Sequence, residues 1–176
     1  MSTFISGGCK NGKSTYAQRI VARLGAPRYY IATMVPRDGE DRERIRRHRL
    51  ERAGLGFETI ECARDILRAL DRADARGAFL LDSVTALLSN EMFAADGIHA
   101  DAGVKIAAEL IEFVRRAPRT AIVSDSIYSD AALYDPLTES YRAALAYIDR
   151  QLARHCDNVL ECVSGLVVVH KGGMPL

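Results

Sequence analysis

Apolar residues along this chain fall into two alternating patterns. Short continuous apolar runs, such as the one that ends at Asp82, are typical of strands buried on both faces of a sheet, whereas apolar residues three and four apart indicate amphipathic helices. We expect strands at residues 3–6, 28–33, 57–61, 78–82, 120–125, 158–163 and 166–170, and helices at 14–24, 37–52, 63–75, 83–93, 104–116 and 140–156. Residues 94–102 and 127–139 show no such period and are expected to be loops, the second of which could contact a substrate.

The alternation of strands with helices predicts an α/β fold, with a mostly parallel sheet and helices on both of its faces. The last two strands are separated only by Ser164-Gly165, which fits an antiparallel hairpin at an edge of the sheet. The length of 176 residues fits a single domain covering residues 1–176.

Composition and charge narrow the range of partners. The sequence is 48% hydrophobic and carries a net charge of +1, so no global attraction to nucleic acid or to an anionic membrane is expected. No apolar run approaches the roughly 18 residues that a membrane-spanning helix needs, and no signal peptide precedes the first strand, so we expect a cytoplasmic protein. The four cysteines show no metal-binding spacing and are expected to be reduced thiols, mostly buried.

The residues that follow the first strand match the phosphate-loop pattern G-x-x-x-x-G-K-[ST]. Glycines let such a loop curl so that its N–H groups face a phosphate, and the following helix adds the positive end of its dipole. Lys13 would then reach the β- and γ-phosphates of ATP or GTP, and Ser14 would bind Mg²⁺. The loop consists of Gly7, Gly8, Cys9, Lys10, Asn11, Gly12, Lys13 and Ser14.

Other candidate residues lie where expected strands end, because parallel sheets bind ligands beyond the carboxyl ends of their strands. Ala32, Thr33 and Met34 end the second strand and should lie near the nucleotide. Asp82 ends the buried strand 78–82, and we expect it beside the phosphate loop, close to the Mg²⁺ that Ser14 binds. The alternative for Asp82 is a surface residue that caps the following helix.

The segment from Arg37 to Arg52 is the most charged part of the chain. One interpretation is a solvent-exposed helix stabilised by ion pairs. A helical wheel nevertheless places Arg44, Ile45, His48 and Arg52 on one face, and Ile45 indicates that this face is turned toward protein. If the helix covers a nucleotide, His48 with Arg44 or Arg52 is best placed to contact phosphate, whereas Arg47 points away.

These residues resemble a known family, the bifunctional adenosylcobinamide kinase / adenosylcobinamide-phosphate guanylyltransferases of cobalamin assembly. The resemblance covers essentially the whole chain and keeps both order and spacing. It rests on the phosphate loop and on Tyr-Ile-Ala-Thr at 30–33, Arg-Ile-x-x-His at 44–48, Thr-x-Glu at 59–61, Leu-Leu-Asp-Ser-Val-Thr at 80–85, Asn-Glu-Met-Phe at 90–93, Tyr-Arg at 141–142 and Val-Ser-Gly at 163–165.

The resemblance implies a P-loop NTPase-type fold and two reactions. The first phosphorylates the aminopropanol hydroxyl of adenosylcobinamide, a corrinoid, with a nucleoside triphosphate. The second attaches GMP from GTP to the new phosphate through a histidine that carries GMP. It further implies nucleotide contacts at Arg49 and Glu61 as well as at the residues named above, and a homotrimer with the nucleotide site near a subunit boundary.

The chain departs from the family pattern at several positions. Arg47 stands where the family has its nucleophilic histidine, and an arginine stays protonated and cannot attack phosphorus. Either His48 is the nucleophile here, or guanylyl transfer is weakened or lost and a monofunctional kinase of a related alcohol remains. The usual Asn-Glu after the third buried strand reads Asp125-Ser126, and the family's Gly-Arg-x-Asn-Gln reads Ala-Tyr-Ile-Asp-Arg at 146–150. A non-catalytic nucleotide switch is the remaining alternative.

Overall fold

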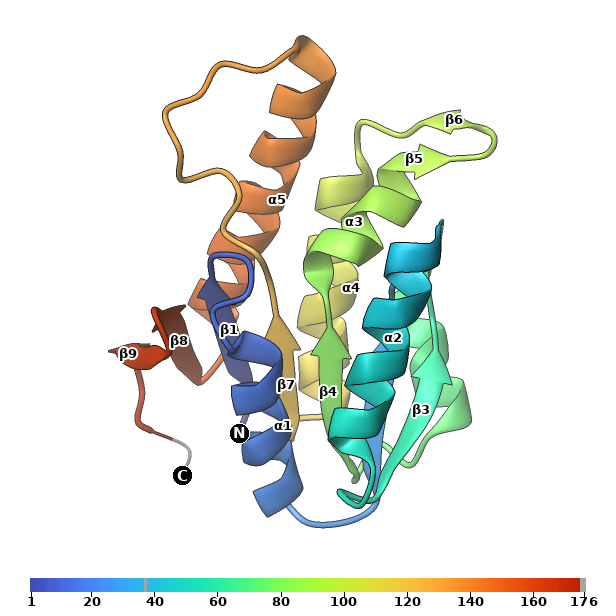
Figure 1. Ribbon diagram of the computed structural model, residues 1–176, viewed down its shortest axis with the longest axis vertical. Helices are drawn as coiled ribbons and strands as arrows, with labels where there is room; N and C mark the ends of the chain where they lie inside the picture. The colour runs from blue at the N-terminus through green and yellow to red at the C-terminus, as the bar shows by residue number, and fades with distance from the viewer. Residues whose placement is uncertain (37, 175–176) are drawn as a thin grey trace.

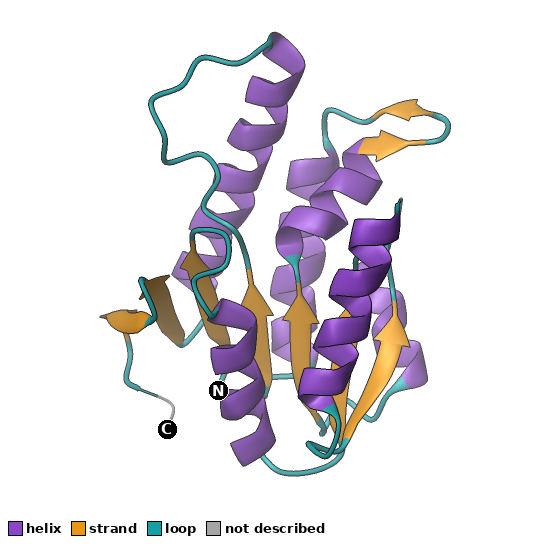
Figure 2. Cartoon of the chain, viewed as in Figure 1, coloured by secondary structure: helices purple, strands orange, loops and turns teal. Residues whose placement is uncertain are grey.

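A computed structural model describes residues 1–36 and 38–174, with the side chains of Arg44 and Glu51 not described. The chain forms a sheet of seven strands between two layers of helices (Figure 1). Figure 2 shows the strands gathered in the middle of the molecule and the helices on both sides of them. The strands are β1 (Thr3–Gly7), β2 (Arg28–Ala32), β3 (Phe57–Glu61), β4 (Ala78–Asp82), β7 (Thr120–Val123), β8 (Asn158–Val163) and β9 (Leu166–Lys171).

The strand order across the sheet is β3-β2-β4-β7-β1-β8-β9. Every neighbouring pair is parallel except β8 and β9, which form the expected antiparallel hairpin. The prediction of a mostly parallel sheet with an antiparallel C-terminal edge is therefore confirmed. The carboxyl ends of the parallel strands meet at one edge of the sheet, and the phosphate loop and Asp82 both lie there.

Successive residues of each central strand face opposite layers, so the protein has two hydrophobic cores. Ile5 and Leu80 pack with helix α1 (Lys13–Arg23) on one face. Phe4 and Phe79 face the other layer. That layer contains α3 (Val84–Met92), α4 (Ala102–Arg116), α5 (Pro136–His155) and the 3₁₀ helix η1 (Ile66–Arg72). The highly charged helix α2 (Gly39–Arg52) lies on the α1 side, over β2 and β4 (Figure 1).

The structure corrects three of the expected elements. The helix expected at 63–75 is the shorter η1, and its first backbone N–H groups bond to carboxylates from α3 and α4: Asp65 N to Glu91 at 2.7 Å and Ile66 N to Glu109 at 3.2 Å. The expected loop 94–102 contains a short antiparallel ladder, β5 (Phe93–Ala94) with β6 (Gly97–Ile98).

The third correction concerns the long C-terminal helix, which begins at Pro136 rather than at residue 140. Asp135 caps it, because its carboxylate accepts hydrogen bonds from the N–H groups of Leu137 and Thr138 at 3.0 and 3.1 Å. Proline fits the first turn of a helix, since the N–H that it lacks would have no partner there. The Asp-Pro pair in the sequence was thus an available start signal.

Candidate nucleotide-binding site

The phosphate loop connects the end of β1 to the start of α1, as its sequence requires. Gly12 precedes the helix with a φ of +84°, a conformation that glycine adopts at little cost. Gly7 has a φ of +148°, and a side chain there would meet the backbone carbonyl of Cys162 on β8. Asn11 donates a hydrogen bond from Nδ2 to the same carbonyl at 3.2 Å. The loop is therefore held against β8 before any ligand binds.

Lys13 is buried, with 6% of its side chain exposed, and its ammonium group already has two acceptors. It lies 2.8 Å from Oδ1 of Asp125 and donates to the carbonyl oxygen of Gly8 at 2.5 Å. Asp125 follows β7, the strand beside β1. The sequence had marked Asp125 only as a departure from the family pattern. A bound triphosphate would have to share the ammonium group of Lys13 with Asp125 or displace Asp125 from it.

Asp82 ends β4, but its strand is not next to the phosphate-loop strand. Asp82 lies at the expected carboxyl-end edge of the sheet, which the phosphate loop shares, but β7 separates β4 from β1. Two inter-strand spacings of about 4.8 Å each put roughly 10 Å between these strands. Asp82 accepts a hydrogen bond from the Tyr30 hydroxyl at 3.1 Å and faces a cavity beneath α2.

The cavity beneath α2 has a volume of about 540 Å³ and is lined by most of the remaining candidate site residues. His48, Arg49 and Arg52 line it from the helix, and the ends of β2, β3 and β4 form its floor. The expected inward face is confirmed for the members whose side chains are described, because Ile45, His48 and Arg52 all line the cavity. Arg47 is exposed and does not line it. The side chain of Arg44 lies outside the described residues.

Arg52 is the most unusual side chain of this cavity. It is 7% exposed, and its Cζ lies 3.4 Å from the centroid of the Tyr30 ring. Burial lowers the pKa of Arg52, because it penalises the charged form. Its Nη1 is buried and has no hydrogen-bond partner among the described residues. A buried cationic donor without an acceptor is costly, and a phosphate oxygen would satisfy it.

Glu61 and the end of β2 complete the floor of the cavity. Glu61 accepts a hydrogen bond from Arg49 at 3.1 Å, so α2 is tied to β3 at this point. Ala32 and Met34 also line the cavity. Thr33 is fully buried instead, and its hydroxyl bonds to the backbone N–H and carbonyl of Ser83 at 2.7 and 2.8 Å. Thr33 therefore shapes the edge of the sheet rather than offering its side chain to a ligand.

A buried carboxyl group lies behind the phosphate loop. Asp149 of α5 is 3% exposed and accepts hydrogen bonds from Tyr128 at 2.8 Å and Ser124 at 3.1 Å. Its Oδ1 is buried without a partner among the described residues. Burial raises the pKa of Asp149 to about 7, with a smaller contribution from the negative charge of Asp125. The sequence marked this position only as a departure from the family pattern.

Neither cysteines nor histidines gather into a metal centre. No group of three or more His, Cys, Asp or Glu residues suited to a metal occurs in the part of the chain that the structure describes. Ser14 and Asp82 offer the hard oxygen donors that Mg²⁺ prefers, and Mg²⁺ in phosphoryl-transfer sites is held by one or two protein groups together with phosphates and water. The residues present therefore fit Mg²⁺ bound together with a nucleotide. Three cysteines are buried and Cys9 is exposed, as expected for reduced thiols.

The fold and the loop define a P-loop nucleotide-binding protein. Solved structures with this fold include an ATPase domain, which gives a TM-score of 0.56 and 11% identity over 97% of this chain and 76% of that one. The RadB recombinase gives a TM-score of 0.52 and 14% identity over 99% of this chain and 82% of that one. At these identities the likeness shows the fold alone. No helix within the described ranges has the length and apolar character needed to cross a membrane.

The particular family follows from the sequence comparison. Residues 3–169 match the family described as cobinamide kinase / cobinamide phosphate guanyltransferase, and the chain belongs to it. It is 30% identical to the bifunctional adenosylcobalamin biosynthesis protein CobP of Pseudomonas aeruginosa, over 98% of both chains. It is 29% identical to the corresponding protein CobU of Salmonella typhimurium, over 96% of this chain and 98% of that one. The chain is thus a transferase of cobalamin biosynthesis, as the resemblance implied.

Proposed function

We propose that the phosphate loop serves the kinase reaction and that the cavity beneath α2 serves guanylyl transfer, with His48 as the carrier of GMP. The observation that carries this assignment is the cavity itself, which brings His48 together with Arg49 and with the buried Arg52, whose Nη1 lacks an acceptor among the described residues. The eight loop residues do not line that cavity, since β7 separates the two places. Two reactions thus have two neighbouring sites on one edge of the sheet.

In the kinase reaction, the aminopropanol hydroxyl of adenosylcobinamide attacks the γ-phosphorus of a nucleoside triphosphate and the bond to the β-phosphate breaks. Lys13 and the loop N–H groups stabilise the charge on the transferred group. Ser14 and Asp82 would hold Mg²⁺, which offsets negative charge on the phosphates when it is bound. The ammonium group of Lys13 is paired with Asp125 in the unliganded protein, so Asp125 competes with the phosphate oxygens for Lys13.

In the guanylyl transfer, a ring nitrogen of His48 attacks the α-phosphorus of GTP and pyrophosphate leaves. An oxygen of the acceptor phosphate then attacks the same phosphorus, and the histidine nitrogen leaves with its electron pair. Arg52 is placed to neutralise charge on the α-phosphate, because its buried Nη1 lacks an acceptor in the described chain and its stacking on Tyr30 fixes its position. Arg49 and Glu61 would contact the rest of the nucleotide.

The test is a labelling experiment with GTP radiolabelled at the α-phosphate. The parent protein should form an adduct that is stable to base and labile to acid, as a phosphorus–nitrogen bond is. The adduct should disappear in His48→Ala and persist in the neighbouring control Arg47→Ala, whose side chain is exposed. A parent protein that forms no adduct, yet phosphorylates adenosylcobinamide, would be a monofunctional kinase and would contradict the role of His48.

The family resemblance further supports a homotrimer in the cytoplasm, with nucleoside triphosphate and corrinoid as its small-molecule ligands and no nucleic-acid partner. Sedimentation equilibrium of the purified chain, with and without GTP, tests the oligomeric state. A mass of one subunit under both conditions would contradict the trimer.

A further inference from the structure

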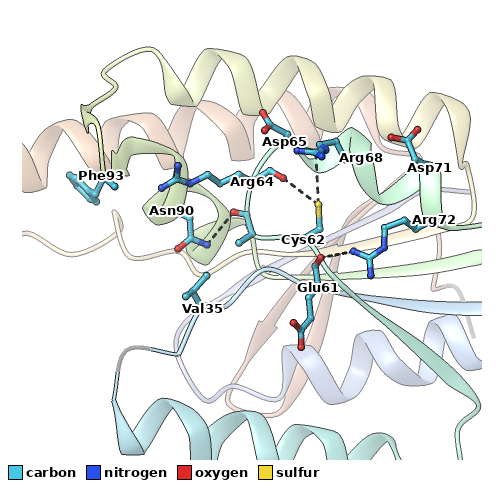
Figure 3. A pocket seen from close by; sticks show the side chains of 12 residues that line it. Val35, Glu61, Cys62, Arg64, Asp65, Arg68, Asp71, Arg72, Asn90 and Phe93 are labelled. Atoms are coloured by element: carbon cyan, nitrogen blue, oxygen red, sulfur yellow. Dashed lines mark hydrogen bonds between the residues drawn. The ribbon is translucent and has the colours of Figure 1, made fainter.

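A second and larger cavity adjoins the one that contains His48. Its volume is about 890 Å³, and its walls come from η1 and the segment before it, from the end of β3 and from α3 (Figure 3). The two cavities share Val35, Glu61, Cys62 and Ala63 as lining residues. A ligand in the larger cavity would therefore lie directly beside whatever His48 carries.

Three arginines, Arg64, Arg68 and Arg72, line this cavity together with three acidic residues. Figure 3 shows Arg64 reaching toward Asn90 and Arg72 toward Glu61, with Arg68 between them. Among the carboxylates that the structure describes, none forms an ion pair with any of the three. Arg72 donates instead to the backbone carbonyl of Glu61 at 3.0 Å.

Two of the three acidic residues in the same lining form ion pairs with cations other than these arginines. Asp65 lies 2.6 Å from Lys105, and Glu61 lies 3.1 Å from Arg49. Asp71 is the remaining acid of the lining. The lining thus offers three guanidinium groups that form no ion pair with a described carboxylate, and such groups suit the anionic oxygens of a ligand.

The segment that carries the arginines is fixed by a cluster of charges behind it. Lys105 of α4 bonds to Asp65 and, at 2.8 Å, to Glu91 of α3, which is 9% exposed. Glu91 also accepts the backbone N–H of Asp65, whose φ of +48° turns the chain into η1. These bonds hold the backbone that presents Arg64 and Arg68, as a preformed binding site requires.

We propose that this arginine-lined cavity binds the phosphate monoester of the second-step acceptor. The inference rests on the proposed function, which makes a large amide-bearing ring with one phosphate arm the substrate of guanylyl transfer. Guanidinium groups recognise such a dianion with paired hydrogen bonds. From this cavity the phosphate oxygen approaches the α-phosphorus on His48, the new phosphorus–oxygen bond forms, and the bond to the histidine nitrogen breaks.

Asn90 adds recognition of the uncharged part of the acceptor. Its Nδ2 donates to the carbonyls of Thr33 and Ala63 at 2.7 and 3.2 Å, which fixes the orientation of the amide. Its oxygen is then available to accept a hydrogen bond from an amide N–H of the ring substituents. The phosphate is held by the arginines, and the ring extends toward the mouth of the cavity.

Calorimetric titration of the purified protein with adenosylcobinamide phosphate tests the site without any nucleotide. Arg64→Ala and Arg68→Ala should each raise the dissociation constant at least tenfold, whereas Arg19→Ala, an exposed position on α1, should leave it unchanged. Binding of adenosylcobinamide, which lacks the phosphate, should change less than twofold in all three variants. Arginine variants that bind the phosphate ester as tightly as the parent would overturn the proposal.

A second measurement separates this proposal from the function on which it rests. In Arg64→Ala and Arg68→Ala, the GMP adduct should form from GTP at the parental rate, while the KM for the acceptor in the transfer step rises at least tenfold. If the variants lose the adduct as well, the cavity binds GTP and the assignment is refuted. If the parent forms no adduct, the role of His48 fails, and the dissociation constants still decide whether the cavity holds the phosphate ester.

Discussion

Replacing Asp149 with asparagine should make the protein more stable than the parent chain at pH 8. The carboxyl group is 3% exposed, and burial raises its pKa from an ordinary value of 3.8 to about 7. Because one pKa unit corresponds to about 1.36 kcal/mol, this difference of roughly three units costs the folded state about 4 kcal/mol once the group is ionised. Asparagine has nearly the same shape, can accept the bonds from Ser124 and Tyr128, and never ionises.

The pH dependence of this effect has a definite sign. Below about pH 4 the carboxyl is protonated in both the folded and the unfolded chain, so it carries no penalty. Between pH 4 and pH 7 the unfolded chain loses the proton while the folded protein of the parent retains it, and the parent becomes less stable as the pH rises. Above pH 7 both states are ionised and the loss is complete. The gain from Asp149→Asn should therefore grow across this window and then level off.

Urea unfolding followed by circular dichroism at pH 5 and pH 8 measures the difference. The stabilising effect of Asp149→Asn should be larger at pH 8 by about 2.5 kcal/mol, since most of the roughly 4 kcal/mol penalty develops above pH 5. Asp71→Asn, at an exposed position, is the matched control and should show the same stability difference from the parent at both pH values. A gain that does not depend on pH, or a variant less stable than the parent at pH 8, would refute the reasoning.

Three further changes test other parts of the structure. Asp125→Asn removes the ion pair with Lys13, so calorimetry should show roughly fivefold tighter nucleotide binding without Mg²⁺; weaker binding would mean that Asp125 helps the ligand. Lys105→Met leaves the carboxylates of Asp65 and Glu91 without their shared cation, so urea titrations should show a free energy of unfolding lower by about 2 kcal/mol. An unchanged urea midpoint would contradict a stabilising role of Lys105. Gly7→Ala should cost about 2 kcal/mol, because its φ of +148° and the carbonyl of Cys162 leave no room for a methyl group; a thermal melt like that of the parent would count against this.

The main features of the fold could be predicted from local patterns. Buried strands appear as continuous apolar runs, and parallel strands joined by helices follow from their alternation, so β1, β2, β4 and β8 lie where the sequence indicated. The errors arose where distant groups decide the local structure. Residues 63–75 contain the 3₁₀ helix η1, whose first N–H groups bond to carboxylates of α3 and α4, and no local pattern records that contact.

The candidate site divides in the same way. The spacing of glycines, Lys13 and Ser14 indicated the phosphate loop, and helical periodicity placed His48 and Arg52 on the inward face of α2. The order of strands was not available from the sequence, so it could not show that β7 lies between the strand of Asp82 and the strand of the phosphate loop. The sequence also offered no means of pairing Asp125 with Lys13, because that contact depends on β7 lying next to β1.

The sequence by itself determined the kind of protein: a phosphate loop after a buried strand, a family-wide order of motifs, and an arginine at position 47 that cannot be a nucleophile. These properties depend on neighbouring residues and on side-chain chemistry. Only the tertiary structure decided which charges meet. It placed β7 between β1, which leads into the phosphate loop, and β4, which ends at Asp82. It also brought the arginines of η1 beside the cavity that His48 lines. Contacts between segments far apart in the chain are set by how the sheet and its helices pack.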